Sequence, residues 1–83
     1  MENILIVDDE KSLLDLLSVV FKKEGYGVKT AISGPRAREI LEKEDVDLVI
    51  TDIKMPQMSG MDVLKFVKGR DSEIPVIMIT AYG

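Results

Sequence analysis

The sequence predicts an α/β fold in which strands and helices alternate around one parallel sheet. Apolar runs of four or five residues recur along the chain, amphipathic stretches separate them, and the links between them are short. Alternation of this kind implies parallel strands that are joined by right-handed crossovers. The 83 residues suffice for one domain, and 46% of them are hydrophobic, which is too many for a disordered chain.

The first part of the chain predicts two strands with a helix between them. Residues 4–7 are apolar and mostly β-branched, which is typical of a strand buried on both faces of a parallel sheet. Residues 11–24 predict a helix, because their apolar side chains recur at i, i+3 and i+4 and Gly25 follows them. Residues 28–32 predict a second, weaker strand.

The middle of the chain repeats this order. Ser33, Gly34 and Pro35 predict the start of a second helix, since proline suits the first helical position. Residues 47–51 form the next apolar run and predict a third strand, which stops at Asp52.

The last part predicts a loop, a short helix and a fourth strand. Residues 54–60 contain Met-Pro and Ser-Gly pairs that are typical of a loop. Residues 61–68 predict the helix. Residues 75–79 are the most apolar of the four runs and predict a strand that Thr80 follows.

Polar side chains follow three of the predicted strands. Asp8 and Asp9 come after the first strand, Asp52 after the third and Thr80 after the fourth. In open α/β sheets, ligands bind beyond the carboxyl ends of the strands, where the strand order reverses. If the first and third strands are neighbours, the three carboxylates converge, and a hard cation such as Mg²⁺ would relieve their repulsion. Asp52 could then act as a nucleophile that forms an aspartyl phosphate.

Each of these residues also has an ordinary structural explanation. Asp8 or Asp9 could cap the helix that follows, because aspartate is a favoured N-cap. Asp52 alone could be a turn aspartate, and Thr80 alone carries little information. The functional prediction depends on all of them falling at strand ends of one predicted sheet.

The composition excludes several other classes of function. The 15 acids and 11 bases give a net charge of −4 with scattered Lys and Arg, which argues against nucleic-acid binding by this segment. Without cysteine or histidine there is no thiolate site, histidine ligand or Ser-His-Asp triad. The start lacks the features of a signal peptide, and no apolar stretch approaches the ~18 residues that span a bilayer. We therefore expect no membrane association and a cytoplasmic location.

Four segments together carry a family resemblance: residues 4–10 with their acidic pair, residues 47–56 with an aspartate three residues before Met-Pro, residues 59–60, and residues 75–83 with Thr-Ala after an apolar strand. With these motifs the sequence resembles the receiver domains of two-component response regulators. The resemblance implies a flavodoxin-like fold with a parallel sheet in the order 2-1-3-4. Its last four residues, Thr-Ala-Tyr-Gly, look most like receivers of sigma-54-dependent activators.

The resemblance also implies a role for each candidate residue. Asp52 would accept a phosphoryl group from a sensor histidine kinase. Asp9 and Asp52 would give carboxylate ligands to Mg²⁺, Lys54 would give a backbone carbonyl, and Asp8 would reach the metal through water. Thr80 would hydrogen-bond the phosphoryl group as the switch residue. A receiver is a signalling domain rather than an enzyme.

Members of the family continue after the fourth strand with a helix, a strand that carries a lysine, and a further helix. Residues 1–83 are therefore expected to form a truncated receiver domain. Its fourth strand would then be an apolar edge, which favours self-association through that strand or an uncovered sheet face. The alternative function is an interaction or oligomerisation module that keeps only the acidic metal site and is not phosphorylated.

Two other phosphate-handling classes fit less well. A haloacid-dehalogenase-type phosphatase places a second aspartate two positions after its nucleophile, where this sequence has Lys54. A dinucleotide-binding domain needs a glycine-rich turn after the first strand, where this sequence has Asp8, Asp9 and Glu10.

Overall fold

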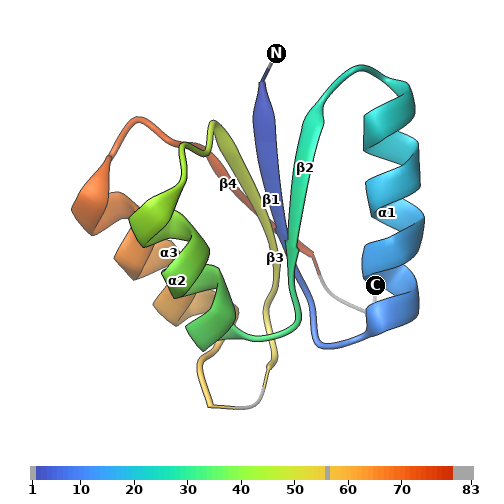
Figure 1. The fold of residues 1–83 in the computed structure, drawn as a ribbon. Helices are drawn as coiled ribbons and strands as arrows, with labels where there is room; N and C mark the ends of the chain where they lie inside the picture. Colours follow the sequence, from blue (N-terminus) through green and yellow to red (C-terminus); the bar gives the residue numbers. More distant parts are fainter. Residues whose placement is uncertain (1, 56, 80–83) are drawn as a thin grey trace.

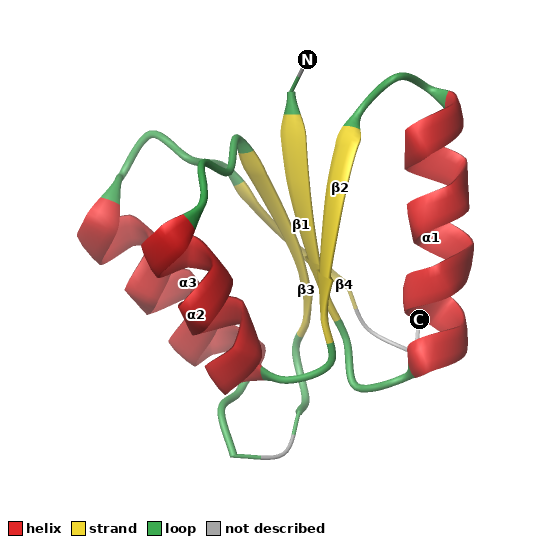
Figure 2. Cartoon of the chain, viewed as in Figure 1, coloured by secondary structure: helices red, strands yellow, loops and turns green. Residues whose placement is uncertain are grey.

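The computed structural model describes residues 2–55 and 57–79, which form one sheet with helices on both faces (Figures 1 and 2). Helix α1 covers one face of the sheet, and α2 and α3 lie side by side on the other. The elements follow the predicted alternation: β1 (Asn3–Val7), α1 (Lys11–Lys23), β2 (Gly27–Ala31), α2 (Gly34–Lys43), β3 (Leu48–Asp52), α3 (Gly60–Arg70) and β4 (Val76–Ile79).

The four strands are parallel and lie in the order β2-β1-β3-β4. The predicted fold class and strand order are therefore confirmed. The order reverses between β1 and β3, because the chain moves outward to β2 before it crosses back. This is the position at which ligands bind in open α/β sheets.

Strand β1 lies at the centre of the core. Its residues alternate between the two faces: Leu5 and Val7 pack in the cluster beneath α2 and α3, and Ile4 and Ile6 pack in the cluster beneath α1. All four are almost fully buried, as the uninterrupted apolar run predicts. The strand that leads to the acidic pair is thus held by packing on both sides.

The ends of the helices differ slightly from the prediction for identifiable reasons. Gly34, rather than Pro35, takes the first position of α2, because Ser33 is the N-cap and accepts a hydrogen bond from the Arg36 amide. Helix α3 begins one residue earlier and ends two residues later than expected. Ser59 caps its start, where a reciprocal capping box with Asp62 satisfies two amide groups.

Candidate acidic metal site

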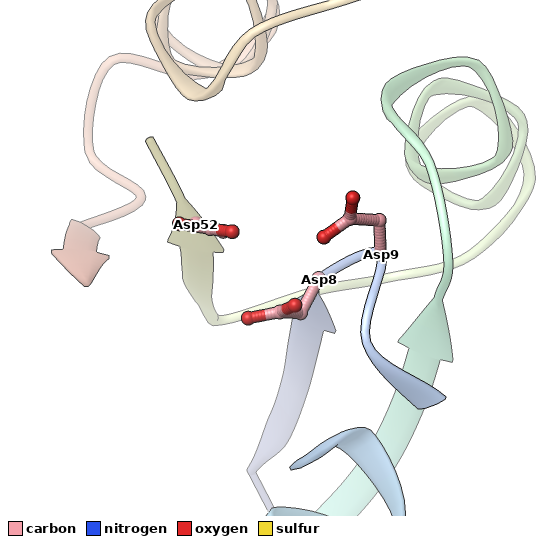
Figure 3. A group of neighbouring side chains, drawn as sticks. All are labelled: Asp8, Asp9 and Asp52. Atoms are coloured by element: carbon pink, nitrogen blue, oxygen red, sulfur yellow. The ribbon is translucent and has the colours of Figure 1, made fainter. Parts of the chain in front are cut away.

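Three carboxylates meet at the carboxyl ends of β1 and β3 (Figure 3). One oxygen each from Asp8, Asp9 and Asp52 can be chosen so that all lie within 4.8 Å of one another. The side chains of Asp9 and Asp52 extend toward each other from the two strand ends, with Asp8 beside them. The convergence predicted from the strand order is therefore what the structure contains.

Asp8 is placed by the sheet and by the turn that follows. Val7, the last residue of β1, pairs with Thr51, so Asp8 follows the strand beside Asp52. The Asp8 amide donates a 3.0 Å hydrogen bond to the Ala31 carbonyl at the end of β2. One Asp8 carboxylate oxygen accepts a 2.8 Å hydrogen bond from the Glu10 amide. Neither the backbone nor the side chain of Asp8 is free to turn away from the cluster.

The idea that Asp8 or Asp9 caps the first helix is wrong. The N-cap of α1 is Glu10, whose side chain makes no capping hydrogen bond. Asp8 lies two residues before Glu10, and its carboxylate accepts a hydrogen bond from the Glu10 amide. This hydrogen bond fixes the backbone before α1 through one carboxylate oxygen, and the other oxygen of Asp8 stays available to a ligand.

Asp52 is the last residue of β3, and hydrogen bonds fix the backbone that follows it. The Ile53 amide donates to the Ile79 carbonyl of β4 at 3.1 Å, and the Gly60 amide donates to the Ile53 carbonyl at 2.8 Å. Gly60, the first residue of α3, lies directly against the Asp52 carbonyl. The Asp52 side chain is half-buried, so it keeps a side open to solvent.

The cluster is electrostatically unfavourable without a cation. Asp8 is only 4% exposed, and this burial raises its pKa above the ordinary 3.8. The hydrogen bond from the Glu10 amide lowers the pKa of Asp8. The negative charges of Asp52, Asp9 and Glu10 raise it further. A divalent cation would remove much of this repulsion.

The donor set fits Mg²⁺. It consists of carboxylate oxygens, which hard cations prefer over nitrogen or sulfur ligands. Asp8 is buried, Asp52 half-buried and Asp9 exposed, so one side of the cluster faces solvent. Mg²⁺ usually keeps several water ligands, and an open side leaves room for them.

Two predicted site residues lie outside this geometry. Lys54 is exposed in the loop after β3, and its role as a carbonyl ligand stays a prediction. Thr80 lies outside the described residues, and so does its predicted contact with a phosphoryl group.

No local sequence pattern marks Ala31, whose carbonyl accepts the Asp8 amide hydrogen bond, or the contact between Gly34 and Met58. A cavity of about 380 Å³ lies elsewhere, between the loops that precede β3 and β4, with Asp47, Val67 and Ile74 among its lining residues. It is at the opposite strand ends from the carboxylates.

Within residues 2–55 and 57–79, no helix combines the length and apolarity that crossing a bilayer requires.

The comparisons with known proteins agree with the fold and the acidic cluster. The family described as "Response regulator receiver domain" matches residues 4–83. Sporulation initiation phosphotransferase F of Bacillus subtilis is 49% identical over 99% of this chain, and response regulator SaeR of Staphylococcus epidermidis is 43% identical over 98% of it. The chain spans 66% of the first of these proteins and 35% of the second.

Among solved structures, the response regulator protein TrrA of Thermotoga maritima, crystallised in complex with Mg(2+)-BeF, matches all of this chain with a TM-score of 0.93 and 37% identity. The match covers 72% of that chain. The profile match, the sequence relatives and the shared architecture agree, and the chain belongs to the family of response regulator receiver domains.

Proposed function

We propose that residues 1–83 act as one receiver unit in which Asp52 accepts a phosphoryl group with the help of Mg²⁺. The convergence of Asp8, Asp9 and Asp52 within 4.8 Å at the reversal of strand order is the observation that carries this proposal. A cluster of three carboxylates that includes a buried one is costly, and a function that needs a cation accounts for it.

The proposed reaction is a phosphoryl transfer to a carboxylate. An Asp52 oxygen forms a bond to phosphorus, and the bond between phosphorus and the donor's leaving group breaks, with its electron pair going to that group. When bound, Mg²⁺ would neutralise charge on the carboxylates and on the incoming phosphoryl group. The half-buried position of Asp52 leaves the approach to its side chain open.

The remaining site residues have supporting roles in this proposal. Asp9 and Asp52 hold the cation with carboxylate oxygens, Lys54 with its backbone carbonyl, and Asp8 through a water molecule. Thr80 hydrogen-bonds the transferred phosphoryl group and acts as the switch. The magnesium and beryllium fluoride in the structure of TrrA support this assignment, because that receiver shares the fold and 37% of the sequence.

The proposed physiological donor is the phosphohistidine of a sensor histidine kinase, and we place this exchange in the cytoplasm. Membership of the response regulator receiver family supports both. The receiver unit is a signalling domain in this proposal. The closer likeness to receivers of sigma-54-dependent activators stays a prediction, and it concerns the output to which the receiver would be linked.

The test is an intact-mass measurement after incubation with acetyl phosphate. The wild-type protein should gain the mass of one phosphoryl group in Mg²⁺ and gain nothing in EDTA. Asp52→Asn should gain nothing in either. Asp15→Asn is the matched control, because Asp15 is an exposed aspartate on α1 that pairs with Lys11, and it should behave as wild type. Wild-type protein that stays unmodified in Mg²⁺ would leave only the interaction-module alternative.

We also propose that a second copy of residues 1–83 docks on the α1 face of the sheet. On that side Leu16 is 59% exposed and Val20 45%, and Ile77 of β4, which pairs with Ile50 beneath α1, is 48% exposed. In the described part of the chain β4 pairs only with β3, so its other edge has free backbone groups. Apolar side chains beside an open strand edge favour pairing with another chain.

Sedimentation velocity at micromolar concentrations tests this second proposal. The wild-type protein should sediment as a dimer, and Ile77→Lys should shift it to the monomer, because a charge on an edge strand opposes pairing. Ile32→Lys is the control, since Ile32 is a similarly exposed isoleucine in the loop after β2. A wild-type monomer across the concentration range contradicts the proposal.

A further inference from the structure

The connection between β2 and α2 contacts the chain on both sides of the acidic cluster. At its start, the Ala31 carbonyl accepts the hydrogen bond from the Asp8 amide. Three residues later, Gly34 opens α2 and lies against Met58 in the loop between β3 and α3. A short segment, residues 31–34, thus links the residue after β1 to the loop that follows Asp52.

The contact between Gly34 and Met58 leaves no room for a side chain. Gly34 is buried, and a Cβ placed on it would overlap the Met58 Cβ and lie 2.6 Å from its Cγ and 2.9 Å from its Sδ. The overlap involves the Cβ, which is attached to the loop backbone, and not only the flexible end of the side chain. A methyl group at position 34 can therefore be accommodated only if the loop or the start of α2 moves.

A short path of contacts connects Met58 with Asp52. Two residues after Met58, Gly60 donates its amide to the Ile53 carbonyl and lies against the Asp52 carbonyl. On the other side, Gln57 has a φ of 69°, in the left-handed region that non-glycine residues rarely adopt. Met58 also packs against the core beneath α2 and α3. A shift of Met58 would therefore disturb both its packing against the core and the contacts of Gly60 with Asp52 and Ile53.

We infer that Gly34 is a positioning residue for the phosphoryl site. Its lack of a side chain lets the start of α2 hold Met58, and through Met58 and Gly60 it fixes where Asp52 lies relative to Asp8. Gly34 has no place in the carboxylate cluster itself, so its influence is indirect. The inference rests on the proposed function, since it concerns the geometry of the same site.

The central experiment compares alanine substitutions at two glycines. Gly34→Ala adds a methyl group against Met58, whereas Gly69→Ala adds the same group in α3, where no atom outside the adjoining helix backbone lies within 4 Å. We expect Gly34→Ala to slow phosphorylation by acetyl phosphate at least about tenfold, because a misplacement of ~1 Å can reduce a rate about a hundredfold. Its Mg²⁺ affinity should fall as well. Gly69→Ala should match wild type in both measurements.

A double-mutant cycle separates positioning from a general loss of structure. Met58→Gly removes the side chain that position 34 contacts, so Gly34→Ala should have no further effect on the phosphorylation rate in that background. All rates are measured below the onset of thermal unfolding of each variant. If Gly34→Ala alone does not fold, the comparison of Met58→Gly with the double variant still decides, because the inference requires equal rates.

The outcomes separate this inference from the proposed function. Wild-type protein that takes no phosphoryl group contradicts the function itself. Wild-type protein that is phosphorylated while Gly34→Ala reacts at the same rate overturns only the positioning role of Gly34. An equal slowing by Gly34→Ala in the wild-type and Met58→Gly backgrounds also overturns it, because the effect would then not pass through Met58.

Discussion

Gly60 lies so close to the carbonyl oxygen of Asp52 that no side chain fits between them. A Cβ at position 60 would overlap that oxygen and lie 2.9 Å from the Ile53 Cα. Both neighbours are backbone atoms, and Ile53 is tied to β4 through Ile79. The first turn of α3 therefore packs directly on the backbone of the proposed phosphoacceptor.

Gly60→Ala should destabilise the protein by about 1–3 kcal/mol, because overpacking against fixed backbone forces the helix to shift. Urea denaturation gives the free energy of unfolding. Gly69→Ala is the control in the same helix, and it should stabilise the protein by roughly 0.5–1 kcal/mol through helix propensity alone. Equal effects of the two substitutions would show that the close approach at Asp52 is not a constraint.

The start of α3 depends on a second local contact, the capping box of Ser59 and Asp62. The Asp62 amide donates to the Ser59 hydroxyl at 3.3 Å, and the Ser59 amide donates to the Asp62 carboxylate at 3.1 Å. Ser59→Ala should cost about 1 kcal/mol of unfolding free energy in urea denaturation. Adding Asp62→Ala should cost less than it does in the wild type, because the box is already broken. Ser12→Ala, on the exposed first turn of α1, should change the free energy by no more than about 0.5 kcal/mol.

The four strands followed from local sequence patterns, and the acidic cluster followed from them once the strand order was known. Short stretches rich in apolar and β-branched residues predicted all four strands, and each predicted end lies within one residue of the observed one. The rule that ligands bind at the carboxyl ends of strands, together with the strand order that the family resemblance implies, predicted that Asp8, Asp9 and Asp52 meet. Such predictions succeed because each depends on neighbours in the chain or on the general geometry of a parallel sheet.

What the sequence did not reveal depends on distant segments. Gly34 contacts Met58 because the start of α2 and the loop after β3 lie on the same face of the sheet. No local sequence pattern marks this contact. The wrong capping assignment has a similar origin. Aspartate is a good N-cap in general, but the Asp8 amide is drawn into the sheet by the Ala31 carbonyl, so the helix begins later, after Glu10.

The raised pKa of Asp8 predicts how metal-free stability depends on pH. Because the folded-state pKa lies above the ordinary 3.8, Asp8 favours folding below pH 3.8, and this contribution is lost as the pH rises through the folded-state pKa. At pH 7 the buried charge is fully unfavourable. In EDTA at pH 7, Asp8→Asn should therefore raise the free energy of unfolding. At pH 3 the difference between the variant and wild type should shrink.

Magnesium should reverse the order of stability. A cation that binds only the folded state stabilises it by about 2.7 kcal/mol at a hundredfold excess over its dissociation constant. The wild-type protein should gain stability as Mg²⁺ is added, whereas Asp8→Asn should gain less, because it lacks one carboxylate of the cluster. Urea denaturation in EDTA and in Mg²⁺ measures both effects on the same two proteins, and Asp15→Asn controls for the loss of an acid elsewhere. If Asp8→Asn were less stable than wild type in EDTA, the Asp8 carboxylate would stabilise the folded protein without a cation, and its cost in the metal-free cluster would be contradicted.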